Sequence, residues 1–185
     1  VDAIIHLIRC FESADNRNVN STVDSVRDLE IIETEMMLAD IESIQKRLGK
    51  NNKKNLDEEQ LKILEIALDC INNNKDISTL KNNFDKKLLN LSGLLFLKPK
   101  IFVCNVDEQS LQGGNDYTKA FINKFGKENS LIVSADIENQ INQLDVSEKK
   151  NYMEMIGLQE TGLKMLIQKG YNILELDTYF TSGPE

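Results

Sequence analysis

The chain has few of the residues that build metal sites and disulfide frameworks. Its 185 residues include one histidine, His6, and three cysteines, Cys10, Cys70 and Cys104. The cysteines are widely spaced and each stands in an apolar stretch, which is typical of reduced core thiols rather than of a disulfide framework or a zinc site. No other histidine or cysteine stands at ligand spacing from His6. We therefore interpret His6 as a core residue rather than as a catalytic or metal-binding one.

Long hydrophobic runs and a basic leader are also lacking. No apolar run approaches membrane-spanning length, and no basic start precedes a small-residue cleavage site. We therefore expect a cytoplasmic protein without a membrane partner. The chain starts at Val1, inside an apolar run and without methionine, which suggests a piece of a longer protein. A net charge of −8 argues against a general polyanion binder, so any contact with nucleic acid must be local.

The stretch that organises the chain is KPKIFVCNVDE, from Lys98 to Glu108. Its apolar run, 101–104, predicts a buried strand of a parallel sheet that ends in a polar loop. A second apolar run, 131–133, ends at Ser134 in the same way, and a helical stretch separates the two. Parallel strands joined by a right-handed crossover bring the loops that follow them to one edge of the sheet, where α/β proteins bind ligands. The sequence therefore predicts an α/β fold in which Asn105 and Ser134 share a site.

Residues 25–97 have the period of helices. Apolar residues recur there at steps of three and four in three stretches, the last of which, 77–95, is expected to form a single helix. These stripes can be buried only against one another. We therefore predict an antiparallel helical coiled-coil arm, inserted between two strands of the sheet.

Four further features are expected outside this arm. Residues 3–10 are rich in β-branched side chains and are predicted to form a strand. Near the other end, Ser147 is expected to cap one helix, and Thr161 to cap a short helix that Gly170 ends. Residues 172–180 alternate enough to predict a final strand.

A basic cluster marks the turn between the first two helical stretches. It consists of Lys46, Arg47, Lys50, Lys53 and Lys54, with no acidic residue among them. A basic turn on an acidic chain is a candidate phosphate-backbone contact, because each cation that neutralises a phosphate adds salt-dependent affinity. A solvated turn that follows a basic helix C-terminus accounts for the same pattern. Both interpretations stay open.

Five stretches together resemble the YchF/Obg-like ATPase family, a branch of the P-loop GTPase superfamily. They are VDAIIHLIRCFE, VDSVRDLEIIETEMMLADIESIQKRL, KPKIFVCNVDE, LIVSADIE and GLQETGLKMLIQKGYNILELDTYFTSGPE, and they extend from one end of the chain to the other. The resemblance implies the C-terminal part of a G-domain-like P-loop NTPase with a mostly parallel sheet. Residues 1–24 and 98–173 would form the nucleotide-binding α/β part, residues 25–97 the inserted arm, and residues 174–185 the start of a TGS domain.

The phosphate-binding loop of that family is missing from this chain. No G-x-x-x-x-G-K-[ST] motif occurs, because Gly49-Lys50 and Gly126-Lys127 lack the upstream glycine. We therefore expect no catalytic or metal-binding residue in this chain, and the ligands of Mg²⁺ outside it. The resemblance implies that the full-length protein hydrolyses ATP, and that GTP is a second candidate nucleotide. This chain alone is expected to be inactive.

The resemblance also implies a base-binding site in the loops after the two strands. Related GTPases have N-K-x-D there, and the aspartate pairs with guanine, whereas this chain has Asn105-Val106-Asp107-Glu108. The valine and the longer carboxylate disturb pairing with guanine. Adenine offers an acceptor at N1 and a donor at N6, which backbone groups near Val106 can match. We therefore expect ATP to bind at least as well as GTP, and a Val106→Lys, Glu108→Asp double variant to favour GTP.

Ser134 and Ala135 resemble the second base-contacting loop of the superfamily, with Asp136 where the family has lysine. We expect Asn105 to organise the site, and Val106 and Ala135 to contact adenine. Without the resemblance, Asn105 and Glu108 fit an Asx-type turn followed by a solvated glutamate. The family is associated with ribosomes, so ribosomal RNA or the ribosome is an expected partner. The alternative function is a non-catalytic module whose arm binds RNA, the ribosome or a protein.

Overall fold

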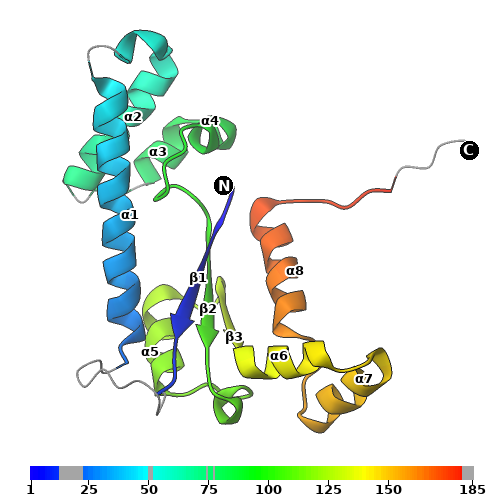
Figure 1. Ribbon diagram of the computed structural model, residues 1–185. Helices are drawn as coiled ribbons and strands as arrows, with labels where there is room; N and C mark the ends of the chain where they lie inside the picture. Colours follow the sequence, from blue (N-terminus) through cyan, green and yellow to red (C-terminus); the bar gives the residue numbers. More distant parts are fainter. Residues whose placement is uncertain (13–22, 50–51, 74, 77, 181–185) are drawn as a thin grey trace, which may run out of the picture. The chain divides into compact units, whose positions relative to one another are not determined.

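The computed structural model describes residues 1–12, 23–49, 52–73, 75–76 and 78–180, with the backbone alone for residues 53, 78 and 79. The chain divides into two compact units, whose elements are labelled in Figure 1. The helical unit comprises Val1–Asp2 and Glu30–Lys98, and the sheet unit comprises Ala3–Leu29 and Pro99–Glu185.

The described part of the sheet unit contains one parallel sheet with the strand order β1-β2-β3. The strands are β1 (Ile4–Arg9), β2 (Lys100–Asn105) and β3 (Ser130–Val133). In the parallel register, Ile8 is opposite Cys104, and Asn105 is opposite Val133. The α/β class and the parallel sheet, both predicted from the apolar runs, are confirmed.

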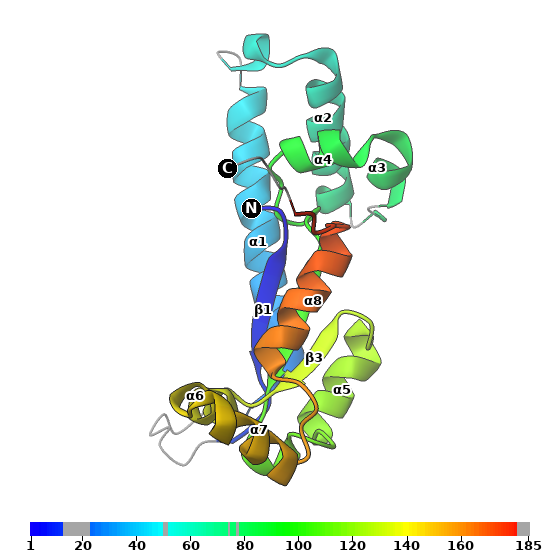
Figure 2. The same cartoon turned by 90° about the vertical axis from the view of Figure 1, so that its right-hand side faces the viewer.

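The two faces of the sheet are covered by different helices. On one face, Phe102 and Cys104 are buried against Phe121 of α5 (Asp116–Phe125), together with Leu29 of α1 (Ser25–Leu48). On the other face α8 (Gly162–Leu174) lies against β3. A Cβ atom at Gly162 would come within 2.7 Å of the Val133 side chain, so the absence of a side chain permits this approach. Figure 1 shows α5 and α8 on opposite sides of the sheet, and in Figure 2 α8 lies in front of the strands.

Four helices and one 3-10 turn form the described part of the helical unit. They are α1, of which the unit holds the residues from Glu30 on, η1 (Lys53–Asn55), α2 (Glu58–Asn72), α3 (Ser78–Asn83) and α4 (Lys86–Leu91). Ile44, Leu64 and Leu80 are fully buried in a core of their own. The Asp57 carboxylate caps α2 by accepting from the Gln60 N–H at 2.7 Å.

The prediction of one helix over residues 77–95 is wrong. The structure has α3 and α4 instead, and α4 starts anew because the Asp85 carboxylate accepts from the Lys87 N–H at 2.7 Å. After Ser92 the chain leaves the helix at Gly93, whose φ is +75°. Residue 77 itself lies outside the described residues.

Two expectations about helix ends in the C-terminal region need correction. Asp145, rather than Ser147, precedes α7 (Val146–Met155) as its N-cap. Thr161 does cap α8, by accepting from the Lys164 N–H at 3.2 Å, but the helix continues past Gly170 to Leu174. A single glycine within a helix costs only about 1 kcal/mol, which is too little to end the helix by itself.

The strand predicted over residues 172–180 is also absent from the described residues. Its first residues finish α8, and Glu175 then takes a left-handed conformation with φ 55°. Residues 176–180 have no regular structure. The last part of the predicted start of a TGS domain, residues 181–185, lies outside the described residues.

Candidate functional site

Two loops meet where β2 and β3 end. The Asn105 side-chain oxygen accepts a hydrogen bond from the Ala135 N–H at 2.9 Å, and the Val106 N–H donates to the Val133 carbonyl at 2.9 Å. The structure therefore brings the loop after β2 to the loop that contains Ser134 and Ala135.

Ser134 and Ala135 stand at the start of α6 (Ala135–Gln143). The first N–H groups of a helix have no partner within the helix, and the Asn105 side chain satisfies one of them here. Ser134 is the N-cap residue, and its hydroxyl oxygen is buried without a partner among the described residues. An unpaired buried hydroxyl costs roughly 1–3 kcal/mol, so a ligand group that reached it and formed a hydrogen bond would remove that cost.

Val106 has a more limited role than expected. Its side chain is 2% exposed, within the core cluster that contains Phe121, and its N–H already donates to Val133. The carbonyl oxygen is the remaining group with which Val106 could meet a base. A lysine at this position would bury an ammonium group in the core, so the Val106→Lys change is expected to destabilise the fold.

Glu108 is exposed, at the start of the 3-10 turn η2 (Glu108–Ser110), which the Asp107 carboxylate caps. Its Oε1 atom accepts from Gln140 Nε2 of α6 at 2.6 Å. Gln140 in turn accepts a hydrogen bond from the Tyr152 hydroxyl of α7. No pattern in the sequence points to Gln140 or Tyr152, because both reach Glu108 through the placement of helices that are distant from it along the chain.

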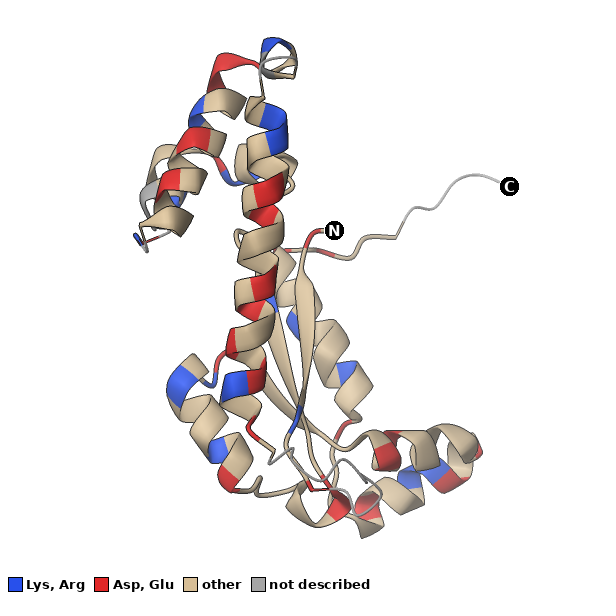
Figure 3. Ribbon diagram, turned by 60° about the vertical axis from the view of Figure 1, so that its left-hand side comes forward, with Lys and Arg blue, Asp and Glu red and all other residues tan. Residues whose placement is uncertain are grey.

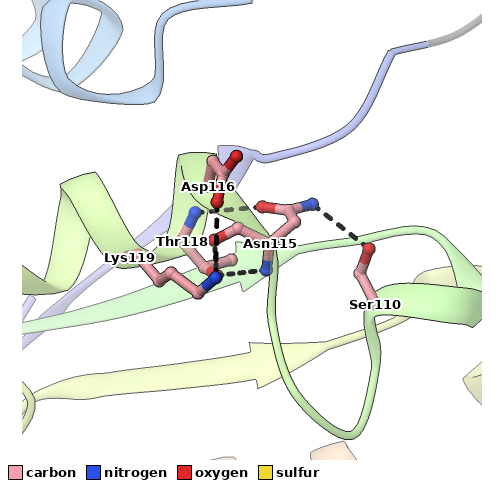
Figure 4. A network of polar contacts seen from close by, with 5 residues as sticks. All are labelled: Ser110, Asn115, Asp116, Thr118 and Lys119. Atoms are coloured by element: carbon pink, nitrogen blue, oxygen red, sulfur yellow. Dashed lines mark hydrogen bonds and ion pairs between the residues drawn. The ribbon is translucent and has the colours of Figure 1, made fainter.

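Asn115 holds the loop between β2 and α5 in place. Its amide nitrogen donates to the Cys10 carbonyl at 2.6 Å and to the Ser110 hydroxyl at 3.4 Å. Its side-chain oxygen accepts from the Thr118 N–H at 3.0 Å, and its own N–H donates to the Thr118 hydroxyl (Figure 4). Gly114, at φ +67°, is required before it, because a Cβ atom there would lie 2.4 Å from the Thr118 hydroxyl oxygen. The loop that carries Glu108 is thus tied to both β1 and α5.

Glu138 connects α6 to α8. Its two carboxylate oxygens accept from the N–H groups of Gly162, at 2.6 Å, and Leu163, at 3.3 Å. A carboxylate is favoured at a helix N-terminus, because it satisfies unpaired N–H groups and complements the helix dipole. The helix α6 is therefore held in place by its hydrogen bonds with Asn105 and Glu108 on one side and with α8 on the other.

Comparison with known proteins gives a consistent result. No family model matches the chain. The ribosome-binding ATPase YchF of Bacillus subtilis is 33% identical over 195 residues, which cover 100% of this chain and 53% of that protein. The ribosome-binding ATPase YchF of Haemophilus ducreyi is 35% identical over 191 residues, which cover 98% of this chain and 52% of that protein. The solved structure of the Schizosaccharomyces pombe YchF GTPase matches with a TM-score of 0.75 and 26% identity, over 99% of this chain and 53% of that one.

Along its whole length the chain is similar to the YchF family. It spans about half the length of the curated relatives it matches. The YchF resemblance of the five stretches quoted above is thereby confirmed, and the meeting of Asn105 with Ala135 is a feature of the YchF-like part that the chain does contain.

The basic cluster of this chain is only partly described. Figure 3 shows the basic end of α1, where Lys46 is exposed but Arg47 is half-buried and donates to the Ser92 carbonyl at 2.6 Å. Lys54 is exposed. Lys50 and the side chain of Lys53 lie outside the described residues. The structure thus assigns Arg47 a contact within the helical unit.

The described residues offer neither a metal site nor a membrane span. No group of three or more His, Cys, Asp or Glu side chains could hold a metal ion in that part of the chain. None of the helices in the same part is both long and apolar enough to cross a membrane. Cys10, Cys70 and Cys104 are buried free thiols, as predicted.

Proposed function

We propose that this chain is the base-recognition half and the helical arm of a ribosome-associated P-loop nucleotide triphosphatase. The full-length protein would bind and hydrolyse ATP in the cytoplasm. The observation that carries the proposal is the hydrogen bond from the Ala135 N–H to Asn105, because it joins the two loops that the family resemblance assigns to base binding. The sheet unit would be the G-domain-like part, and the helical unit the inserted coiled-coil arm.

The groups at the site favour adenine. An ionised carboxylate only accepts hydrogen bonds, as does a backbone carbonyl, so Glu108 and the carbonyl of Val106 both suit the N6 amine of adenine. Guanine presents a carbonyl oxygen at the equivalent position. The relatives from B. subtilis and H. ducreyi are named ATPases, whereas that from S. pombe is named a GTPase, so GTP is kept as the second nucleotide.

The phosphates and Mg²⁺ would be held by residues outside this chain. The described residues offer no cluster that could ligate a metal ion, and the sequence has no phosphate-binding loop. The chain's own contribution to the reaction is therefore to bind the base and so to place the nucleotide. No step of hydrolysis is assigned to its residues.

The test is a pair of nucleotide dissociation constants, measured on the full-length protein. Glu108→Asp withdraws the carboxylate by one methylene while keeping its charge. We expect the ratio of the dissociation constants for GTP and ATP to fall by about five- to tenfold, the size of one ordinary hydrogen bond. Val106 is left unchanged, because its burial would confound a change there. An unaltered ratio would reject the base site.

A second candidate function is a ribosome- or RNA-binding helical module. The observation that favours it is the exposure of Lys46 and Lys54 at the turn between α1 and α2. The bacterial relatives are named ribosome-binding, which supports the same candidate. Both functions are compatible in one protein, because nucleotide binding and ribosome binding would use different units of the chain.

A further inference from the structure

Three polar side chains from three different elements are linked by a series of hydrogen bonds that ends at Glu108. The Tyr152 hydroxyl of α7 donates to Gln140 Oε1, and Gln140 Nε2 of α6 donates to Glu108 Oε1 at 2.6 Å. The donors and acceptors available fix the direction of these hydrogen bonds. Ionised Glu108 can only accept, so the NH₂ end of the Gln140 amide must face it, and the amide oxygen is then left to accept from Tyr152.

We infer that Gln140, oriented by Tyr152, is a specificity-determining residue that selects adenine over guanine by occupying one oxygen of Glu108. This inference rests on the proposed base-binding function. Guanine offers two adjacent donors, N1–H and the exocyclic amine, and needs both carboxylate oxygens of an acidic partner. Gln140 already uses one acceptor site of Oε1 and fixes the direction of the carboxylate, which is then not free to turn both oxygens toward the base. Oε2 is left as the free acceptor, which matches the single N6 amine that adenine presents.

Tyr152 is a positioning residue in this arrangement. An amide that faces solvent can turn its oxygen or its nitrogen toward a neighbour, and a partner at its far side selects one orientation. By donating to Gln140 Oε1, the hydroxyl keeps Nε2 directed at Glu108. Removal of the hydroxyl should therefore loosen the restraint on Glu108, without abolishing it.

The three side chains contribute little to the folded core. Glu108 and Gln140 are exposed and Tyr152 is half-buried, so water competes for these hydrogen bonds in the free protein. A bound base that excludes water would strengthen them. The substitutions proposed below are thus expected to leave the fold intact and to act on base selection.

The experiment measures dissociation constants for ATP, GTP and ITP on the full-length protein by calorimetry. Gln140→Leu should lower the ratio of the GTP and ATP constants by about five- to tenfold, and Tyr152→Phe by about two- to threefold. ITP has the N1–H donor of guanine but no exocyclic amine, so its gain in Gln140→Leu should be smaller than that of GTP. The matched control is Gln143→Leu, because Gln143 stands on the same helix but donates to Asn139 at 3.4 Å.

The outcomes separate this inference from the function on which it rests. The inference is overturned if Gln140→Leu leaves the ratio unchanged, raises it or weakens the binding of both nucleotides equally. In that case the base site itself still stands if Glu108→Ala weakens the binding of ATP. If the unmodified protein binds neither nucleotide, both fail. Should Gln140→Leu not fold, Gln140→Asn, which withdraws the amide by one methylene, decides in its place together with Tyr152→Phe.

Discussion

The side-chain oxygen of Asn105, at the end of β2, lies 2.9 Å from the backbone nitrogen of Ala135, at the start of α6, and accepts its hydrogen bond. Residues 30 positions apart are thus joined by a single amide. Because the same N–H would otherwise be an unpaired helix-start donor, the bond stabilises α6 and fixes the loop before it. Asn105 thereby holds the loop before α6 in place through a contact with protein.

We predict that Asn105→Ala weakens ATP binding by about tenfold in the full-length protein and lowers the free energy of unfolding by about 1 kcal/mol. The expected cause is loss of the acceptor for the Ala135 N–H. Calorimetry and urea denaturation measure the two effects. Asn105→Asp is the matched control, because it keeps an oxygen at the same place, and it should retain most of both properties. Equal losses in both variants would contradict the assigned role.

A second prediction concerns Asp40, a carboxylate that is 3% exposed within the helical unit. Its oxygens accept from the N–H groups of Leu95, at 2.9 Å, and Phe96, at 2.8 Å. Asp40→Ala would leave both donors unpaired, and each lost charge-assisted bond costs about 1–3 kcal/mol. We expect the helical unit to lose about 2–4 kcal/mol of its free energy of unfolding in urea denaturation followed by circular dichroism.

The control for this prediction is Glu42→Ala, which removes an exposed carboxylate from the same helix. It should change the free energy of unfolding by no more than about 0.5 kcal/mol. A similar effect of the two substitutions would show that the Asp40 bonds contribute no more than surface charge does.

The sequence predicts the sheet more accurately than it predicts the helical unit that contains Asp40. The apolar runs locate β2 and β3, and the rule that parallel strands end at one edge is enough to place Asn105 beside the Ser134 loop. The periodicity of residues 77–95 predicts one helix, but the Asp85 carboxylate caps a new helix, α4, within it. At the end of the stretch, Asp40 binds the N–H groups of Leu95 and Phe96 from 55 and 56 residues away, and no local pattern reveals a partner at that distance.

The same limit applies to single side chains in the two candidate sites. Charge alone groups Arg47 with the basic cluster, yet its guanidinium bonds the Ser92 carbonyl. The family resemblance predicts that Val106 contacts a base, and because its side chain packs in the core, its carbonyl oxygen is the group left for that contact. Gln140 has no sequence signal at all, because its contact with Glu108 depends on how α6 lies against the loop after β2. Residue type and spacing indicate the edge of the sheet but not the direction of each side chain.

A third prediction concerns pH. The Cys104 thiol contacts the Cys10 sulfur and is buried, and both effects hold its pKa well above the ordinary value of 9.0. A raised pKa means that the full contribution to stability is present below pH 9 and is lost as the pH rises further, because the unfolded thiol ionises while the buried one stays neutral. The free energy of unfolding should therefore fall above pH 9, by at most about 1.4 kcal/mol per pH unit from this group.

The comparison that isolates Cys104 is Cys104→Ser, which is close in size and does not titrate in this range. Melting temperatures of the two proteins from pH 7 to pH 10 should differ by a constant amount up to about pH 8.5, and should converge above it as the unmodified protein loses stability faster. Parallel curves over the whole range would rule out a raised pKa at Cys104.

The last prediction tests the helical unit as a ribosome contact. Lys46→Glu with Lys54→Glu reverses two exposed charges at the turn between α1 and α2. If both lysines meet phosphates, the affinity for ribosomes should fall, and the slope of its logarithm against the logarithm of salt concentration should decrease by about one per lysine. Arg47 is left unchanged, because reversing its charge would break the bond to Ser92. Co-sedimentation over a salt series measures both quantities.

The matched control reverses the charge of Lys81 and Lys87, which are exposed on α3 and α4 of the same unit. Net charge changes equally in the two double variants, so a general repulsion from RNA would weaken both alike, whereas a specific contact at the turn would weaken only the first. Nucleotide dissociation constants should stay the same in both, since the proposed base site lies in the sheet unit. Unchanged ribosome binding in the first variant would leave Lys46 and Lys54 as solvated residues at the end of a basic helix.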